Sequence, residues 1–213
     1  MKKRMTQPQD MTCGTPWKLI LMFAVPLILG NIFQELYTIV DTMVVGKKLG
    51  VNALAAVGAT GWVFMFNSML IQGFTQGFGI QIAKMVGEND TVKLKRAISN
   101  SIILSALLSI VLSLGMQLII NPAMHILRIP LNIRDISVTY LRVIFVGIPF
   151  SVAYNIFAVI LRSLGNSKTP LNAMVISTSS NIVLDILFVV GFQWGVIGAA
   201  VATLVSNVIA TLY

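Results

Sequence analysis

Residues 19–46 read LILMFAVPLILGNIFQELYTIVDTMVVG, a run in which apolar side chains dominate and only two residues are charged. About 20 such residues suffice for a helix to cross the hydrocarbon core of a bilayer, so the run predicts a transmembrane helix. Asp41 lies inside it, where an ionised carboxylate at the helix centre costs roughly 2.5–3.5 kcal/mol. A partner, a cation or a water-filled cavity must stabilise such a residue, which makes Asp41 a functional candidate.

Five further runs of the same kind follow. The chain has 213 residues, of which 56% are hydrophobic and 10% are charged, and its mean hydropathy is +0.87. The predicted spans are 19–46, 53–82, 98–120, 136–161, 171–192 and 196–213. Short connections rich in Gly and Pro favour one compact bundle, an all-α membrane protein with six transmembrane helices. Because the last run is still apolar at Tyr213, we expect it to be truncated and the chain to be one part of a larger architecture.

The basic residues predict the orientation of the bundle. The net charge is +8, yet the Lys and Arg residues lie mainly in the connections between spans, which argues against nucleic acid as a partner and for the lipid bilayer. Ten of them, including Lys2, Lys3 and Arg4, lie on the side of the N-terminus, and four lie on the other side. The positive-inside rule therefore predicts a cytoplasmic tail at 1–16, followed by a transmembrane lobe at 17–213 in the cell membrane.

Polar side chains gather on one face of several predicted helices. In the first helix their spacings of three, four and seven confine them to an arc of roughly 120°. Polar faces inside a membrane turn away from lipid, so these helices are expected to surround a hydrated cavity. The residues are Asn31, Gln34, Glu35, Thr38, Asp41 and Thr42 in the first helix, Ser151 and Asn155 in the fourth, Met174, Thr178, Asn181 and Asp185 in the fifth, and Thr203, Ser206 and Asn207 in the sixth.

Depth along the helices predicts an ion site. At ~1.5 Å per residue, Asp41 lies about 9 Å below the outer end of its helix, and Asp185 and Thr203 lie about 12 Å below theirs. Two carboxylates, an amide oxygen from Asn181 and a hydroxyl from Thr203 suit a hard monovalent cation, and the two acids could equally share a proton. A static core, in which each aspartate separately accepts hydrogen bonds, is the structural alternative.

Four motifs in order resemble the multidrug and toxic compound extrusion (MATE) family, from about Thr15 to the end of the chain. Pro26 with DTMVVGKKLG at 41–50 and ALAA at 53–56 is similar to the family's first-helix signature. LRSLGNSKTP at 161–170 resembles its basic loop before the fifth helix, although Ser163 stands where the family often has Gly. NIVLD at 181–185 and GVIGAAVAT at 195–203 resemble its fifth and sixth helices.

The resemblance implies one lobe of a twelve-helix, two-lobe antiporter, with the second six-helix lobe as its partner. Such a protein is a transporter rather than an enzyme and needs no cofactor; inward flow of Na+ or H+ drives export of amphipathic, often cationic compounds by alternating access. Carried over by position, Asp41, Asn181, Asp185 and Thr203 form the cation site. Gln34, Asn155 and Met174 line the drug cavity, and the polar faces add Thr178 and Glu35, although Glu35 could instead hydrogen-bond across helices.

Other functions are compatible with parts of the pattern. A flippase for lipid-linked sugars, from the same superfamily, is expected to have a cationic cavity, whereas the charges placed on the cavity-facing side here are acidic. An intramembrane aspartyl protease also needs two aspartates on separate helices, but Asp41 follows Val40 and Asp185 follows Leu184, so neither the Tyr-Asp nor the Gly-x-Gly-Asp signature occurs. An oligomeric channel lacks a charged ring or a filter-like segment.

Overall fold

The computed structural model describes residues 15–88 and 90–213. Most of the predicted cytoplasmic tail at 1–16, including its basic start, lies outside the described residues. The elements are α1 Pro16–Leu49, α2 Val51–Gly87, α3 Thr91–Ile126, α4 Leu131–Val146, α5 Ile148–Ser163, α6 Lys168–Asp185, the π-helix η1 Ile186–Gly191, and α7 Gly195–Leu212.

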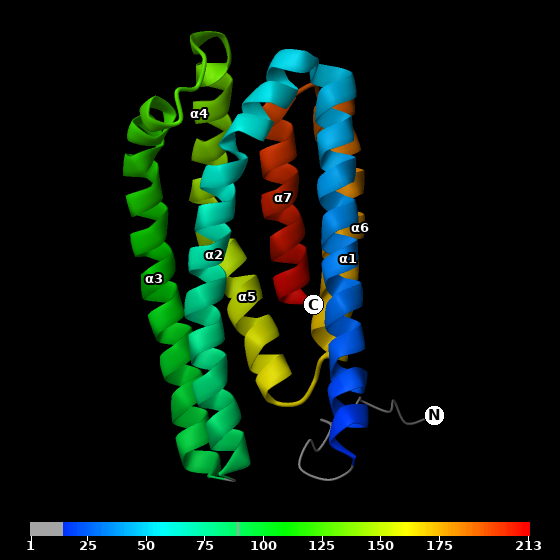
Figure 1. Ribbon diagram of the computed structural model, residues 1–213, viewed down its shortest axis with the longest axis vertical. Helices are drawn as coiled ribbons and strands as arrows, with labels where there is room; N and C mark the ends of the chain where they lie inside the picture. Colours follow the sequence, from blue (N-terminus) through cyan, green and yellow to red (C-terminus); the bar gives the residue numbers. More distant parts are fainter. Residues whose placement is uncertain (1–14, 89) are drawn as a thin grey trace.

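The fold class predicted from the sequence is confirmed. Five spans in the described chain are long and apolar enough to cross a membrane, and α4 with α5 forms a sixth, bent by 47°. The helices run side by side along the long axis of the molecule (Figure 1). The α1–α2, α3–α4 and η1–α7 connections lie at one end, and the α2–α3 and α5–α6 connections lie at the opposite end. α6 packs against α1 and α7, whereas α2 packs against α3, α4 and α5.

Many polar side chains are inside the bundle, and many large apolar ones are outside. Asn67 and Ser105 are 4% and 1% exposed, whereas Leu118 and Ile103 are 79% and 58% exposed. This distribution is expected of helices in lipid, where backbone groups bond within each helix and polar side chains turn inward.

The bend between α4 and α5 has a local cause in Pro149. Proline has no N–H, so the carbonyl of Phe145, four residues earlier, loses its helical donor. The hydroxyl of Ser113 on α3 donates to that carbonyl oxygen at 2.7 Å. One turn away, Nε2 of Gln117 donates to the carbonyl oxygen of Arg142 at 2.9 Å. The neighbouring helix α3 therefore supplies the donor that the bent span has lost at Phe145, and it makes a second hydrogen bond one turn away.

The predicted span 171–192 is one continuous run in sequence but two elements in space. The α-helix ends at Asp185 and a π-helix continues to Gly191. A π-turn places an extra residue in the helix and is frequent at functional sites. Gly198 lets α7 approach it closely, because a Cβ there would lie 3.1 Å from the backbone carbonyl of Phe188.

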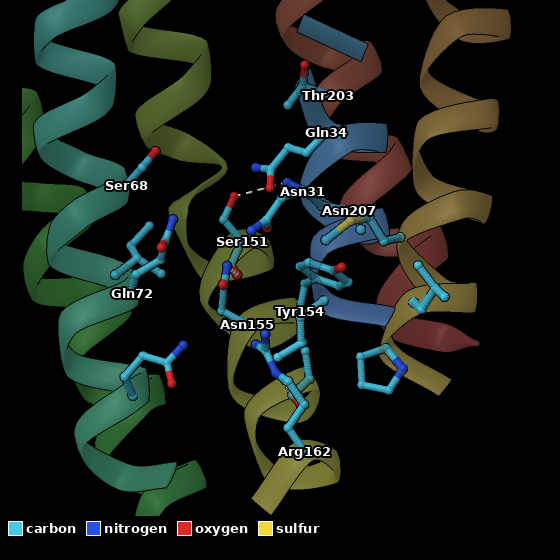
Figure 2. A pocket seen from close by; sticks show the side chains of 18 of the residues that line it. Asn31, Gln34, Ser68, Gln72, Ser151, Tyr154, Asn155, Arg162, Thr203 and Asn207 are labelled. Atoms are coloured by element: carbon cyan, nitrogen blue, oxygen red, sulfur yellow. Dashed lines mark hydrogen bonds between the residues drawn. The ribbon is translucent and has the colours of Figure 1, made fainter. Parts of the chain in front are cut away.

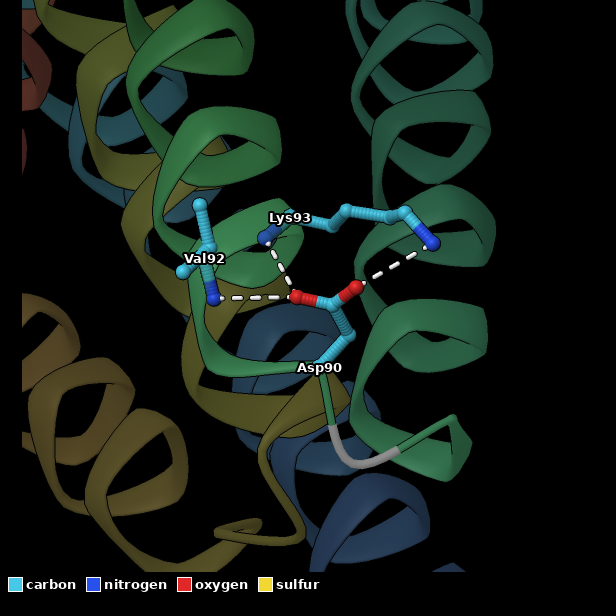
Figure 3. A network of polar contacts seen from close by, with 3 residues as sticks. All are labelled: Asp90, Val92 and Lys93. Atoms are coloured by element: carbon cyan, nitrogen blue, oxygen red, sulfur yellow. Dashed lines mark hydrogen bonds and ion pairs between the residues drawn. The ribbon is translucent and has the colours of Figure 1, made fainter.

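The turn between α2 and α3 is fixed by Asp90, the N-cap of α3. Its carboxylate accepts hydrogen bonds from the backbone N–H groups of Val92 (3.1 Å) and Lys93 (2.9 Å) and pairs with the Lys93 ammonium at 3.1 Å (Figure 3). The pKa of Asp90 lies below its ordinary value, mainly because its carboxylate accepts a hydrogen bond from the Lys93 backbone N–H and next because it contacts the Lys93 ammonium. A carboxylate here also faces the positive end of the helix dipole.

We expect Asp90→Ala to lower the thermal stability of the protein slightly and Asp90→Asn to lower it less, because Asn keeps the cap and loses only the ion pair. The sign of the pH dependence follows from the lowered pKa of Asp90. Its contribution is complete above the ordinary pKa of an aspartate and is lost as the pH falls through the lowered folded-state value. Thermal unfolding of the three proteins at neutral and acid pH checks this; a wild-type advantage that survives full protonation would contradict it.

Candidate ion site and adjoining cavity

Two acids from different helices meet inside the bundle. Asp41 on α1 is 8% exposed and Asp185, the last residue of α6, is fully buried. α1 packs against α6, and the two carboxyl groups lie within hydrogen-bonding reach of each other. Two ionised carboxylates in contact repel each other, so this arrangement requires a shared proton or a cation.

Asn181 lies between Asp185 and α7. With the amide oriented so that both of its ends are paired, Nδ2 of Asn181 donates to Oδ2 of Asp185 at 2.9 Å, and its oxygen accepts from the backbone N–H of Thr203 at 3.3 Å. The hydroxyl of Thr203 donates to the carbonyl of Ala199 at 3.2 Å. The structure thus brings together the four residues predicted for the ion site. In this orientation, however, Asn181 supplies an N–H donor to the carboxylate and not the oxygen ligand expected from the sequence.

Both acids keep one oxygen unpaired. Among the described residues, Oδ1 of Asp41 and Oδ1 of Asp185 are buried and have no hydrogen-bond partner. A buried acceptor without a donor is costly, and a proton or a small cation would satisfy it. The two carboxylates and the Thr203 hydroxyl are hard oxygen donors, so the residues present fit a proton or an alkali-metal cation.

A cavity of about 210 Å³ opens beside Thr203. α1, α2, α5, α6 and α7 all contribute to its wall (Figure 2). The predicted residues Gln34, Asn155 and Met174 line it. Nδ2 of Asn207 donates to the hydroxyl of Ser151 at 3.1 Å and ties α7 to α5 across the wall.

A smaller cavity of about 70 Å³ adjoins the large cavity. It shares Gln34, Met174 and Thr203 with the large cavity and adds Thr178 and Asn181. Thr178 lines this smaller cavity. Asn181 faces this space and also binds Asp185, so one side chain touches both the cavity and the ion site.

Two expectations from the polar stripe of the first helix are wrong. Glu35 is exposed on α1 and lines neither cavity, because it is turned about 100° from Gln34 around the helix. The hydroxyls of Thr38 and Thr42 donate to carbonyls of their own helix, at Gln34 (3.1 Å) and Thr38 (2.7 Å), and line neither cavity.

The charge of the large cavity also differs from the expectation. Asp41 and Asp185 are not among its described lining residues, and the charged side chain that is among them is Arg162 of α5. We expected acidic charges there because both aspartates lie on the polar faces of their helices. The pairing of α1 with α6 buries them beside the cavity instead.

The wall that α2 contributes was not predicted from the sequence. Ser68, Gln72 and Gln76 line the cavity at spacings of four, and Asn67 lies beside them. The four-residue repeat was a usable signal, and it marks a polar stripe like the one on the first helix. Arg162 gave no such signal, because a basic residue near a span end is normally a topology marker.

The chain is similar in sequence to known proteins. The MatE family model matches residues 26–187. The probable multidrug resistance protein YpnP of Bacillus subtilis is 30% identical over 204 residues, covering 96% of the chain and 46% of that protein. The multidrug export protein MepA of Staphylococcus saprophyticus is 28% identical over 197 residues, covering 92% of the chain and 44% of that protein.

Solved structures agree in fold. A MOP superfamily transporter from Pyrococcus furiosus superposes with a TM-score of 0.87 at 33% identity, covering 93% of the chain and 44% of that structure. A MATE transporter in complex with MaD5 gives 0.89 at 32% identity, with 97% and 47% covered. The chain thus spans less than half the length of these relatives. With a family match over most of its length and a fold shared with solved members, the protein belongs to the MATE family of multidrug efflux transporters, which are multi-pass membrane proteins and not enzymes.

Proposed function

We propose that this chain forms the ion-coupled lobe of an antiporter that exports amphipathic compounds, often cationic in this family, by alternating access. It exchanges them for inward movement of Na+ or H+. The contact between Asp41 and Asp185 carries the proposal. Each of these acids keeps a buried oxygen that has no donor in the part of the chain that the structure describes, and this supports binding of a cation or proton at the pair.

Asn181 and Thr203 supply the connection to the exported compound. Asn181 hydrogen-bonds Asp185 and also lines the smaller cavity, while Thr203 lines both cavities. A change at the acids that turns the Asn181 amide therefore changes the wall that a bound compound touches. Coupling of this kind requires that the ion bind the two conformations of the transporter with different affinity.

The driving force is sufficient for useful export. One net charge moved inward per exported compound gains ~2.3 kcal/mol per 100 mV, which supports roughly fortyfold accumulation. When a monocationic compound leaves for one monovalent cation, no net charge moves and the ion gradient alone drives export. We place the protein in the cell membrane with its N-terminus in the cytoplasm, and we propose a second six-helix lobe as the partner that closes the other side of the cavity. The family relatives are named as multidrug exporters, which favours this function over sugar-lipid flipping or proteolysis.

The proposal is tested with the protein expressed from its complete gene and reconstituted in vesicles loaded with ethidium. An inward gradient of Na+ or of H+, imposed separately, is expected to accelerate dye efflux with one of the two ions. An ionophore that collapses that gradient should return dye efflux to the rate measured with protein-free vesicles. Equal efflux with and without either gradient would refute ion coupling.

A further inference from the structure

From the wall of the large cavity we infer an anion-binding subsite at Arg162, which receives a carboxylate or phosphate group of the bound compound. This inference rests on the proposed export function and specifies its substrate class. The favoured compounds then have an amphipathic body and an anionic group, alone or beside a positive charge.

The first observation is the charge of the wall. Among the described lining residues, Arg162 is the one ionised side chain. The remaining polar groups are hydroxyls and seven amides, and an amide can bind either sign of charge without preferring one. The amides are Asn31, Gln34, Asn67, Gln72, Gln76, Asn155 and Asn207. The fixed charge of this wall is therefore positive.

The second observation is that the guanidinium of Arg162 has no counter-ion in the described chain. Its Nε donates to the carbonyl of Ala158 in its own helix at 3.2 Å, which leaves both terminal nitrogens without an acceptor among the described residues. Among the described residues, the titratable group that interacts with it electrostatically is the phenol of Tyr154, which is uncharged at neutral pH. The ion pair formed among the described residues lies elsewhere, between Lys93 and Asp90.

The third observation is the placement of the side chain. Arg162 is partly buried on α5, on the same helix face as Tyr154 and Ala158, because these residues are spaced by four. Figure 2 shows Arg162 at one end of the cavity, with Asn155 and Tyr154 above it on the same helix. Its Nε bond fixes the stem, so the terminal nitrogens form a fork that is already oriented. Such a fork matches the two oxygens of a carboxylate or phosphate.

These observations together favour an anionic ligand group. A partly desolvated guanidinium without a counter-charge is unfavourable, and a bound anion relieves that cost. The two buried acids do not neutralise Arg162, because they contact each other on the α1–α6 side and line neither cavity. The same chemistry is offered by a soluble organic anion and by an anionic lipid headgroup, so the test needs an arm for each.

The first arm uses rhodamine 6G, a cationic ethyl ester, and its free acid, which has the same ring system and one carboxylate more. Binding of each dye is measured by fluorescence polarisation at equilibrium, with the complete protein in phosphatidylcholine nanodiscs and no ion gradient. We expect Arg162→Gln to weaken binding of the free acid about tenfold or more and to leave the ester unchanged. Arg162→Lys should retain part of the affinity, because it keeps the charge and loses the fork.

The second arm replaces the dyes with fluorescent phosphatidylglycerol and fluorescent phosphatidylcholine. If Arg162→Gln lowers the affinity only for the free-acid dye, the ligand of the subsite is a soluble compound. If it lowers the affinity only for phosphatidylglycerol, the ligand is a lipid headgroup. Lys168→Gln is the matched control, since Lys168 is an exposed cation six residues away and its removal should affect neither arm.

Two results would overturn the subsite. One is an equal loss of affinity for both members of a pair, with and without the additional anionic charge, which would make Arg162 a structural residue. The other is no loss in either arm. Because no gradient is applied, these results are independent of ion coupling: Asp185→Asn, which tests the proposed function, should keep the preference for the free acid.

Discussion

Asp185→Asn is expected to reduce ion-dependent drug export to the background rate of protein-free vesicles while leaving membrane insertion intact. Asn has nearly the shape of Asp, so the fully buried site stays filled. It cannot carry the negative charge that attracts a cation, nor bind and release a proton near neutral pH. Asp41→Asn should have the same effect, because either substitution removes one member of the contacting pair. Efflux from vesicles with an imposed ion gradient is the measurement.

Asp135→Asn is the matched control for these variants. Asp135 is an exposed carboxylate on α4, so its loss changes the net charge equally without touching the pair. Wild-type export is expected from it. If Asp41→Asn and Asp185→Asn both exported at the wild-type rate under the same gradient, the pair would have no coupling role, and its contact would be a feature of the core alone.

Gly79→Val is expected to destabilise the folded bundle strongly. Gly79 on α2 is buried against α5, and a Cβ there would lie 2.5 Å from Cγ1 of Val159. Val159 is 2% exposed and has one strongly preferred rotamer in a helix, so it cannot turn aside. Overpacking of this kind typically costs about 1–3 kcal/mol. The close packing of α2 on α5 also lets the Ser163 hydroxyl donate to the carbonyl of Gly79 at 2.9 Å, and separating the two helices would break that hydrogen bond.

Thermal unfolding in detergent measures the effect, and two further sets of variants make it specific. Gly77→Val inserts the same side chain two residues away, where a Cβ meets nothing within 4 Å, so only the small difference in helix propensity should remain. Combining Gly79→Ala with Val159→Ala should cost less than the sum of the single changes, because the second change makes room for the first. Additive losses would show that the close approach of α2 and α5 is not the cause.

The sequence by itself determined that this chain contributes six membrane spans. Length and hydropathy of a run are local properties, and a run of about 20 apolar residues has few alternatives to a transmembrane helix. Asp41 and Asp185 were also recognisable locally, since an acid inside such a run is costly wherever its helix packs. Gln34 and Asn155, which helical periodicity put on polar faces, lie in the cavity wall, whereas Glu35, at the edge of its stripe, lines neither cavity.

Only the tertiary structure decided which side chains meet. Helix rotation and sliding are set by close approaches such as those at Gly79 and Gly198, and hydropathy does not encode them. The packing of α1 on α6 buried the acids as a pair beside the cavity, and α5 turned Arg162 into it. The charge that faces a ligand was therefore fixed by the relative rotation of helices, and that rotation is a property of their interfaces and not of any one span.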